Sequence, residues 1–276
     1  MNVDAYKLSV YFGDSLSAGA KLASDAIIDC FEEHELAVAA LFRGIEGFGA
    51  NKRIHAVRFP DLSEDLPILA WAVDSRRRIL DALDGVDRAV GRGLITLERA
   101  RLVTGEDVRT AAFPSGPGAA AKLTVYCGRG ERSSGRVAYR EIVDMLRQHG
   151  VSGATALMGV DGLYQGRRQR ARLLRRSGSV PLAIISVGDA GALGRALPSF
   201  RELVPVPVAT IERITVVKHD GRLLEPLPRI ESQTDGEHGV WQTIRVYTRE
   251  SALVEGRTLY TELTRRLRAA GAAGVT

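Results

Sequence analysis

A glycine-rich stretch near the start of this 276-residue chain combines a permissive backbone with charge. It reads Arg43-Gly44-Ile45-Glu46-Gly47-Phe48-Gly49-Ala50-Asn51-Lys52-Arg53-Ile54-His55 and lies between two apolar, extended runs. Glycine allows positive φ and a close approach of the backbone to a ligand. The stretch is therefore typical of a recognition loop joining two strands, although a tight surface turn has the same make-up.

A second stretch, Val90-Gly91-Arg92-Gly93-Leu94, places an arginine between two glycines just before an expected strand. Backbone N–H groups freed by glycine, together with a guanidinium, would form a nest for a phosphate group. A plain helix-to-strand turn is the competing interpretation.

Other residues that could do chemistry do not form a catalytic set. The histidines are scattered, and Cys30 and Cys127 lack metal-ligand spacing and are expected to be buried packing residues. We therefore expect neither a catalytic site nor a metal site, and we do not expect an enzyme. The acidic stretch Asp61, Glu64 and Asp65 could hold a divalent cation, but a solvated turn is favoured.

A basic run with six arginines spans residues 167–176. Such a run could bind phosphates, but it lacks interleaved aromatic side chains for base stacking. A solvated or interface-facing basic arm is at least as good an interpretation, so nucleic acid is a minor hypothesis.

Composition sets broad limits on the kind of protein. The chain is 45% hydrophobic and 26% charged, and its formal charge of +5 permits an anionic partner without demanding one. No apolar run approaches the roughly 20 residues that span a bilayer. The N-terminus does not resemble a signal peptide, and a reduced cytoplasmic protein is the simplest fit.

An internal repeat gives the fold. Tyr6-Lys7-Leu8-Ser9-Val10-Tyr11-Phe12-Gly13 recurs 115 residues later as Ala121-Lys122-Leu123-Thr124-Val125-Tyr126-Cys127-Gly128, and again as Gln242-Thr243-Ile244-Arg245-Val246-Tyr247-Thr248-Arg249. Apolar and polar residues alternate in all three copies, which is the period of a half-buried strand. A helix with apolar residues about four apart follows each strand, as with Ala23, Ile27 and Phe31.

The first two copies continue with strand, strand, helix and strand. Each predicts a βαββαβ unit of the α+β class, ferredoxin-like, with an antiparallel sheet and helices on one face. Pro198 is expected to kink or shorten the last helix of the second copy. The expected divisions are a first unit at 1–103, a linker at 104–120, a second unit at 121–218, a linker at 219–240 and a partial third unit with one strand and one helix at 241–276.

These motifs resemble a known family, the domain of unknown function numbered 190, within the PII-like superfamily. Three stretches carry the resemblance: Lys7 to Gly13, Arg43 to Gly49 with Arg53-Ile54-His55, and Asp61 to Pro67. The first copy matches almost throughout, the second more loosely, and the tail matches as a partial third copy.

The resemblance implies a function that composition and spacing do not reveal. PII-like proteins are typically trimers that bind small effectors, often adenine nucleotides, in clefts between units, and a long loop (the T-loop) reports the bound state to a partner. Gly47-Phe48-Gly49 stands where Gly-Phe-Gly opens that loop, and Gly91-Arg92-Gly93 is similar to the loop that helps hold phosphates. The usual basic pair after that second loop is missing, and Glu98-Arg99 with Arg101 is a loose substitute.

We therefore expect a non-enzymatic sensor that binds a small anionic effector, such as an adenine nucleotide, between units. The expected ligand-binding residues are Arg43, Glu46, Gly47, Phe48, Gly49, Lys52, Arg53, Gly91, Arg92 and Gly93. The expected assembly is a trimer-like homo-oligomer or an intramolecular pseudo-trimer. The resemblance also implies a membrane transporter as partner, such as a fluoride exporter, because genes of the two kinds often lie close together. A ligand-free scaffold protein of the same fold is the alternative.

Overall fold

The computed structural model describes residues 2–49, 53–56, 65–91, 93–164, 166–170, 180–224 and 243–276. The first unit follows the expected order. Its elements are β1 (Asn2–Gly13), α1 (Ala23–Glu33), β4 (Val38–Arg43), β7 (Pro67–Ser75), α2 (Arg76–Val90) and β8 (Leu94–Thr104). Ser75 caps α2, since its hydroxyl accepts a hydrogen bond from the Arg78 backbone N–H.

The second unit repeats this order with a broken last helix. Its elements are β9 (Ala120–Gly128), α3 (Ala138–Gln148), β12 (Ala154–Met158), β15 (Pro181–Asp189), α4 (Ala190–Ala196), a 3₁₀ turn (Leu197–Ser199), α5 (Phe200–Leu203) and β16 (Val208–Ile214). Pro198 lies in the 3₁₀ turn, so the predicted interruption of this helix is confirmed.

Short hairpins that the sequence analysis did not foresee complete the units. A two-stranded hairpin precedes the first helix of every copy: β2 (Ser17–Ala18) with β3 (Lys21–Leu22), β10 (Arg132–Ser133) with β11 (Arg136–Val137), and β19 (Leu253–Val254) with β20 (Arg257–Thr258). The T-loop regions form β5 (Glu46–Phe48) with β6 (Ile54–Ala56), and β13 (Asp161–Tyr164) with β14 (Arg167–Arg168). Between units lie a 3₁₀ helix (Gly105–Arg109) and a hairpin of β17 (Lys218–His219) with β18 (Arg222–Leu223).

The strands of both units join in one ten-stranded sheet with the order β12-β15-β9-β16-β8-β1-β7-β4-β13-β14. Antiparallel pairing of β16 with β8 joins the two units. β12 and β13 stand near opposite ends of this order, yet only Gly159 and Val160 separate them in the chain. The Gly159 N–H donates to the Pro181 carbonyl of β15, and the Val160 N–H donates to the Leu41 carbonyl of β4. The sheet must therefore curve back on itself.

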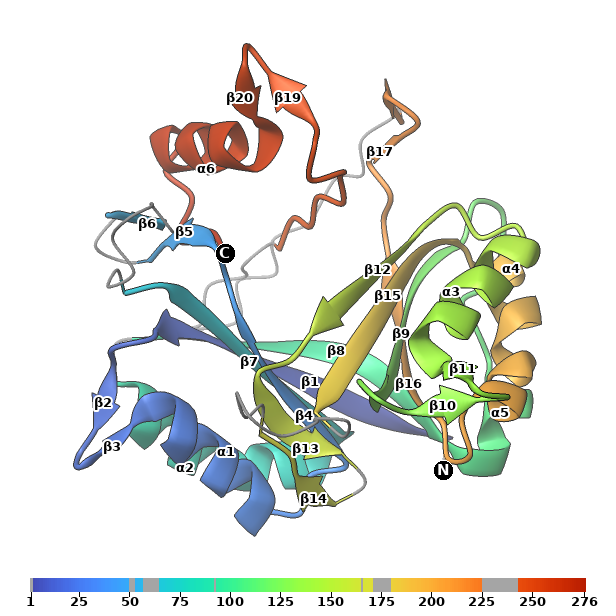
Figure 1. Cartoon of the computed structure of the whole chain (residues 1–276), viewed down its shortest axis with the longest axis horizontal. Coiled ribbons are helices and arrows are strands. Elements are labelled where there is room, and N and C mark those ends of the chain that lie inside the picture. Colours follow the sequence, from blue (N-terminus) through green and yellow to red (C-terminus); the bar gives the residue numbers. More distant parts are fainter. Residues whose placement is uncertain are drawn as a thin grey trace.

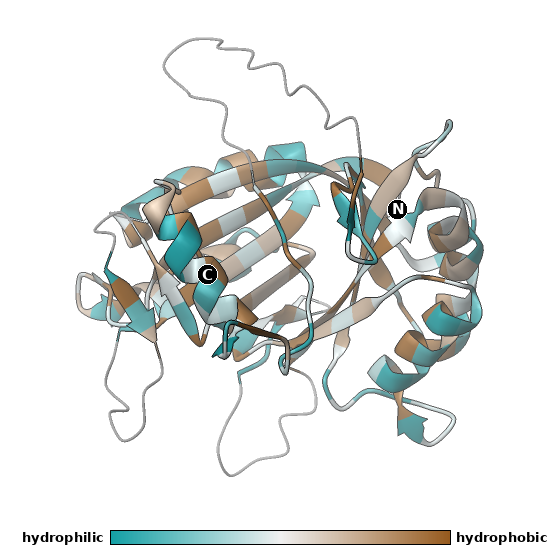
Figure 2. Ribbon diagram, turned by 90° about the horizontal axis from the view of Figure 1, so that it is seen from above, coloured by the Kyte–Doolittle hydropathy of each residue, from teal (hydrophilic) through white to brown (hydrophobic). Residues whose placement is uncertain are grey.

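The closed sheet has its helices outside (Figure 1). One core cluster packs α1 and α2 of the first unit on their strands, and a second packs α3, α4 and α5 on theirs. The helices of the two units lie on opposite sides of the molecule, with the strands between them (Figure 2). A third cluster, which includes Val38, Trp71, Tyr126 and Ile185, draws on both units and fills the interior.

This closure corrects one sequence expectation. The alternating pattern of the first repeated strand predicted one buried and one solvated face. Leu8 and Val10 do pack under the helices, but Lys7 and Ser9 on the other face are also buried. Alternation alone does not reveal this, because the polar face is covered by strands distant in the sequence.

The third copy forms only in part. Its helix α6 (Leu259–Ala269) is present as predicted, but the strand predicted at 242–249 is wrong, because residues 243–248 form no strand within the described part of the chain. The reason is that this segment joins no sheet. Its Arg245 side chain instead reaches Glu98 on β8, at 2.5 Å. Cys30 and Cys127 are both buried, as predicted.

Candidate functional site: the junctions between units

The two glycine-rich stretches of the sequence lie at one end of the first unit's sheet. Gly44 donates its backbone N–H to the Pro67 carbonyl at 2.8 Å, and Pro67 pairs with Gly13 at the end of β1. A Cβ placed on Gly93 would lie 2.8 Å from the Tyr11 carbonyl oxygen of the same strand. The fold therefore brings Gly44 and the turn after α2 to the same end of the sheet.

The predicted site residues differ in how they are engaged. Arg43 forms an ion pair with Asp14, and Gly91 ends α2 at φ 57° with its N–H donated to the Asp87 carbonyl. Arg53 is exposed, and a Cβ on Gly49 would meet nothing within 4 Å. Lys52 and Arg92 lie outside the described residues.

The acidic stretch has only one member in the described part of the chain. Asp65 accepts a hydrogen bond from the Ser15 backbone N–H at 2.7 Å, while Asp61 and Glu64 lie outside the described residues. No group of three or more metal-ligand side chains occurs among the residues that the structure describes.

The hairpin of the second unit docks on the first unit at what we call the β13 junction. Strand β13 pairs antiparallel with β4, so that Leu163 lies opposite Ala39, and it also contacts α1. A Cβ on Gly162 would lie 2.3 Å from the Ala39 carbonyl oxygen, so this approach requires glycine.

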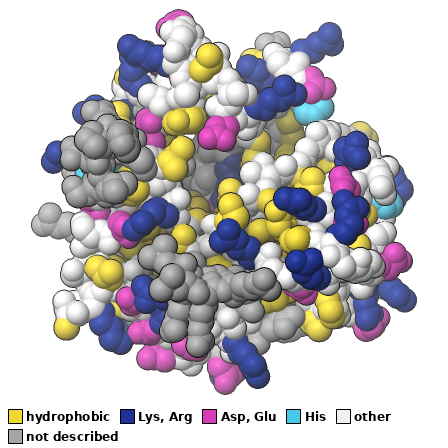
Figure 3. Space-filling view, viewed as in Figure 1, with side chains coloured by type: hydrophobic (Ala, Val, Ile, Leu, Met, Phe, Trp, Pro, Cys, Tyr) yellow, Lys and Arg dark blue, Asp and Glu magenta, His cyan; other side chains and the backbone are white. Residues whose placement is uncertain are grey.

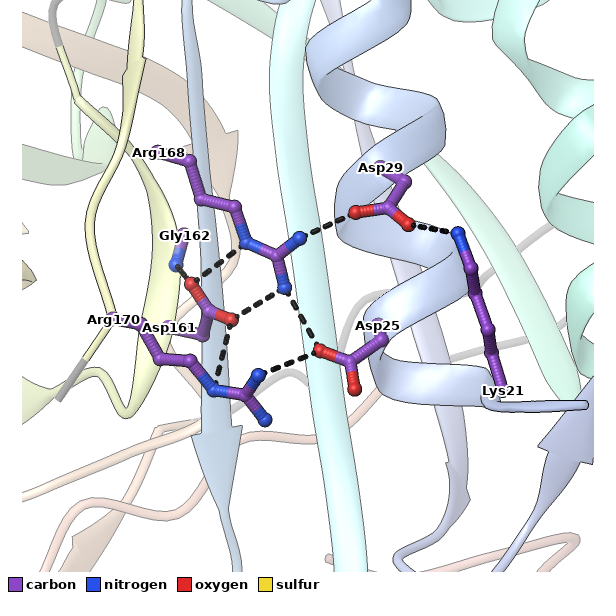
Figure 4. Close-up of polar contacts among 7 residues, drawn as sticks. All are labelled: Lys21, Asp25, Asp29, Asp161, Gly162, Arg168 and Arg170. Carbon is purple, nitrogen blue, oxygen red and sulfur yellow. Dashed lines mark hydrogen bonds and ion pairs between the residues drawn. The ribbon is translucent and has the colours of Figure 1, made fainter. Parts of the chain in front are cut away.

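Charged side chains hold the β13 junction closed (Figure 4). The Arg168 guanidinium reaches Asp161 of its own hairpin at 2.8 Å, Asp25 of α1 at 2.9 Å and also Asp29 of α1. Arg170 adds a 3.0 Å contact to Asp25. A hydrogen bond from Lys21 and the nearby Arg168 charge lower the pKa of Asp29, although partial burial opposes the shift.

The hairpin of the first unit forms an equivalent joint with the third copy, which we call the β5 junction. Phe48 and Val275 exchange two backbone hydrogen bonds, each 2.9 Å long, and β5 contacts α6. A Cβ on Gly47 would lie 2.3 Å from the Val275 carbonyl oxygen. In the repeat, Gly47 and Phe48 correspond to Gly162 and Leu163, and Val275 corresponds to Ala39.

The side chains of the two junctions differ in charge. Asp161, Asp25 and Asp29 at the β13 junction correspond to Glu46, Thr261 and Arg265 at the β5 junction. Arg168, which pairs with Leu163 in its hairpin, is replaced by Ile54, which pairs with Phe48. Three acids and one base thus become one acid and one base. Glu46 accepts a 2.8 Å hydrogen bond from the Thr261 hydroxyl in place of the ion pairs.

The ion pairs of the β13 junction were not predicted from the sequence. Asp25 and Asp29 do carry a local signal, since their spacing of four residues puts both on one face of α1. Their partner Arg168 belongs to the basic run at residues 167–176. The interpretation of that run as an interface-facing arm fits Arg168 and Arg170. Residues 171–176 lie outside the described residues. Basic side chains on the face shown in Figure 3 are scattered and do not form one patch.

Comparisons with known proteins identify relatives of this chain. The model of a family described as "Uncharacterized ACR", DUF190, matches residues 5–102 and again residues 120–216. The UPF0166 protein MJ1524 of Methanocaldococcus jannaschii is 28% identical over 82 residues, which are 30% of this chain and 76% of that protein.

Two solved structures show distant likeness. An unknown protein from Galdieria sulphuraria has 12% identity and a TM-score of 0.24, with 77% of this chain and 99% of that chain covered. The regulatory subunit of aspartate kinase from Thermus flavus has 11% identity and a TM-score of 0.31, with 72% and 95% covered. Among the described residues, no helix is both long and apolar enough to span a membrane.

Proposed function

Since this chain belongs to the uncharacterized family DUF190, we propose that it is a regulatory protein, not an enzyme, which senses a small anionic effector at the β5 junction. The proposal rests on the contrast between the two junctions. They share one backbone joint, but the ion pairs of Arg168 cross the β13 junction, whereas at the β5 junction a threonine and an arginine replace two aspartates of α1.

The charge of the β5 junction favours an anion as effector. The equivalents of Asp25 and Asp29 are Thr261 and Arg265, so two negative charges are lost and one positive charge is gained. Arg265 pairs with Glu262 of α6. Arg53 lies in the same hairpin region, and the turn of Gly91 and Gly93 shares this end of the sheet. Guanidinium groups and backbone N–H groups are the usual donors to phosphate, so a nucleotide is the effector class to test first.

Effector binding would be transmitted through the hairpin. Glu46, Gly47 and Phe48 contact α6 and the C-terminal residues, and Gly49 follows them in the chain. An effector that alters the backbone pairing of Val275 with Phe48 would therefore alter the stretch after Gly49, which we propose contacts a partner. The repeated joint also supports an internal pseudo-trimer. The hairpin of the second copy docks on the first copy, and the hairpin of the first copy docks on the third, through the same positions of the repeat.

Isothermal titration of the full chain against adenine nucleotides, cyclic nucleotides and divalent metal ions tests the proposal. We expect saturable binding of at least one nucleotide. Thr261→Asp would place a carboxylate beside Glu46 and should weaken that binding at least tenfold. Ser115→Asp, the same charge change at an exposed residue of the linker, should leave it unchanged. No binding across the panel, or equal binding by both variants, would contradict the proposal.

A further inference from the structure

The interior of the closed sheet contains charged groups and buried hydroxyl groups beside apolar side chains. Lys7 on β1 lies opposite Glu98 on β8, and Lys122 on β9 lies opposite Glu212 on β16. These residues alternate with Leu8, Leu123 and Ile211, which pack under the helices, so the charged side chains point inward. Arg245 of the third copy is exposed and reaches Glu98 from the rim of this interior.

The interior charges do not balance. Lys122 forms ion pairs with Glu212 and, at 3.6 Å, with Glu98, which also accepts the 2.5 Å hydrogen bond from Arg245. Burial would raise the pKa of Glu98, but Lys7, Arg245 and Lys122 outweigh burial and lower that pKa to about 2. Three basic side chains (Lys7, Lys122 and Arg245) therefore lie near two acidic ones (Glu98 and Glu212).

Lys7 is the basic group left without an acidic partner in direct contact. Its side chain is 1% exposed, and within the described part of the chain no carboxylate lies within ion-pair distance of its ammonium. Its Nζ atom lies 4.1 Å from the ring centre of Trp71 instead. A cation over an indole face is attracted to it, but this contact accepts none of the three N–H bonds.

Trp71 presents a second buried donor at the same place. It is 3% exposed, and its indole Nε1–H has no hydrogen-bond partner in the structure. The indole nitrogen can only donate. A buried donor without an acceptor is destabilising, and the nearby Ser9, Thr210 and Glu212 also carry a buried oxygen without a hydrogen-bond partner among the described residues. Since Lys7 has no carboxylate in contact, an acceptor that carries negative charge would serve both Lys7 and Trp71.

We propose that the interior of the closed sheet binds a small monovalent inorganic anion beside Lys7 and Trp71. Water could accept the hydrogen bonds, but it would leave the excess positive charge uncompensated at low dielectric, where an unpaired charge is costly. A halide or nitrate meets both needs. The site is separate from the β5 junction, since it draws on the inner strands and not on the hairpins.

Tryptophan fluorescence of the Trp241→Phe variant tests this proposal, because Trp71 is then the remaining tryptophan of the two in the sequence. The protein is titrated with sodium chloride, bromide or nitrate at constant ionic strength, with the bulky sulfonate MES as the balancing anion. We expect a saturable change in Trp71 emission with at least one small anion. A strictly linear quenching curve, or no change, would mean water only and would overturn the proposal.

Two variants locate the site. Lys7→Met in the same background should weaken anion binding at least tenfold, while Lys218→Met, at an exposed lysine, should leave it unchanged. If Lys7→Met does not fold, Trp71→Phe is used, which keeps an aromatic ring but removes the indole N–H donor. Calorimetric titration of this variant should show weaker anion binding than in the parent chain. Unchanged affinity in Lys7→Met, or in Trp71→Phe where that variant is used, would overturn the proposal.

Discussion

Gly47 and Gly162 occupy the same place in the two copies, and each lies where a Cβ would come within 2.3 Å of a carbonyl oxygen from another copy, that of Val275 or of Ala39. Twice in this chain, therefore, the hairpin of one copy docks on another copy at the position of Ala39 or its counterpart Val275. This repeated joint explains why the glycines of the two hairpins coincide while their charged neighbours differ.

The β13 joint should tolerate no side chain at residue 162. Gly162→Ala places a methyl group against the Ala39 carbonyl at φ 154°, so we expect a loss of about 2–4 kcal/mol in the free energy of unfolding. Gly166→Ala is the matched control, because residue 166 also has positive φ (71°) but has open space around it. The free energy of unfolding of this control should fall by only about 1 kcal/mol. Urea unfolding measures both, and equal losses would mean that φ, not the joint, sets the cost.

The β5 joint should open without unfolding the units. Gly47→Ala puts a methyl group against the Val275 carbonyl, so we expect the two hydrogen bonds between Phe48 and Val275 to break. Amide hydrogen exchange should then be at least tenfold faster at Val275, with little change in β1 or β7. Gly49→Ala, which meets nothing within 4 Å, should keep the exchange rate of the parent chain. Retained protection at Val275 in Gly47→Ala would contradict this joint.

Arg168 should stabilise the β13 junction more than its neighbour does. Arg168→Gln removes the guanidinium shared by Asp161, Asp25 and Asp29 and leaves Asp161 buried with a weaker partner. Because Arg168 is partly exposed and Arg170 remains, we expect a loss of about 1–3 kcal/mol. Arg167→Gln, at an exposed side chain, should stay within about 0.5 kcal/mol of the parent. Denaturant unfolding compares the two, and similar losses would remove the special role of Arg168.

Sequence alone predicts the units of this fold well, because their information is local. The spacing of Ala23, Ile27 and Phe31 marks a helix face, and Pro198 breaks the helix that contains it. The closure of the sheet is not local, since it depends on Leu163 finding Ala39 more than a hundred residues away. That pairing also buries Lys7, whose strand pattern predicted a solvated face.

The candidate site was predictable in its backbone but not in its contacts. Glycines at 44 and 47 of the first copy and at 159 and 162 of the second mark both hairpins in the sequence. No local pattern shows that Val275 meets Phe48, because the two residues lie far apart in the sequence. The repeat supplies the missing signal, since Val275 stands where Ala39 stands in the first copy.

The buried Lys7 should make stability depend on pH in a defined direction. Burial, then the nearby Lys122 charge, lower the pKa of Lys7 from 10.5 to about 7. The unfolded chain therefore holds this proton up to about pH 10.5 and the folded chain only up to about pH 7. Between these values the unfolded state binds more protons, so the free energy of unfolding rises with pH. The cost of charged Lys7 is fully present below pH 7 and is relieved as the pH approaches 10.5.

Lys7→Met removes this cost. In MES without small anions, we expect the variant to exceed the parent in free energy of unfolding by up to about 5 kcal/mol at pH 6, with the difference shrinking between pH 7 and 10.5. The charged groups that act on Lys7 are present in both proteins: Lys122, Glu212, Arg245 and Glu98. Lys218→Met, at an exposed lysine, should give a flat difference near zero. A flat difference for Lys7→Met as well would show that Lys7 keeps its ordinary pKa in the folded protein, and the interior would then need no anion to hold it.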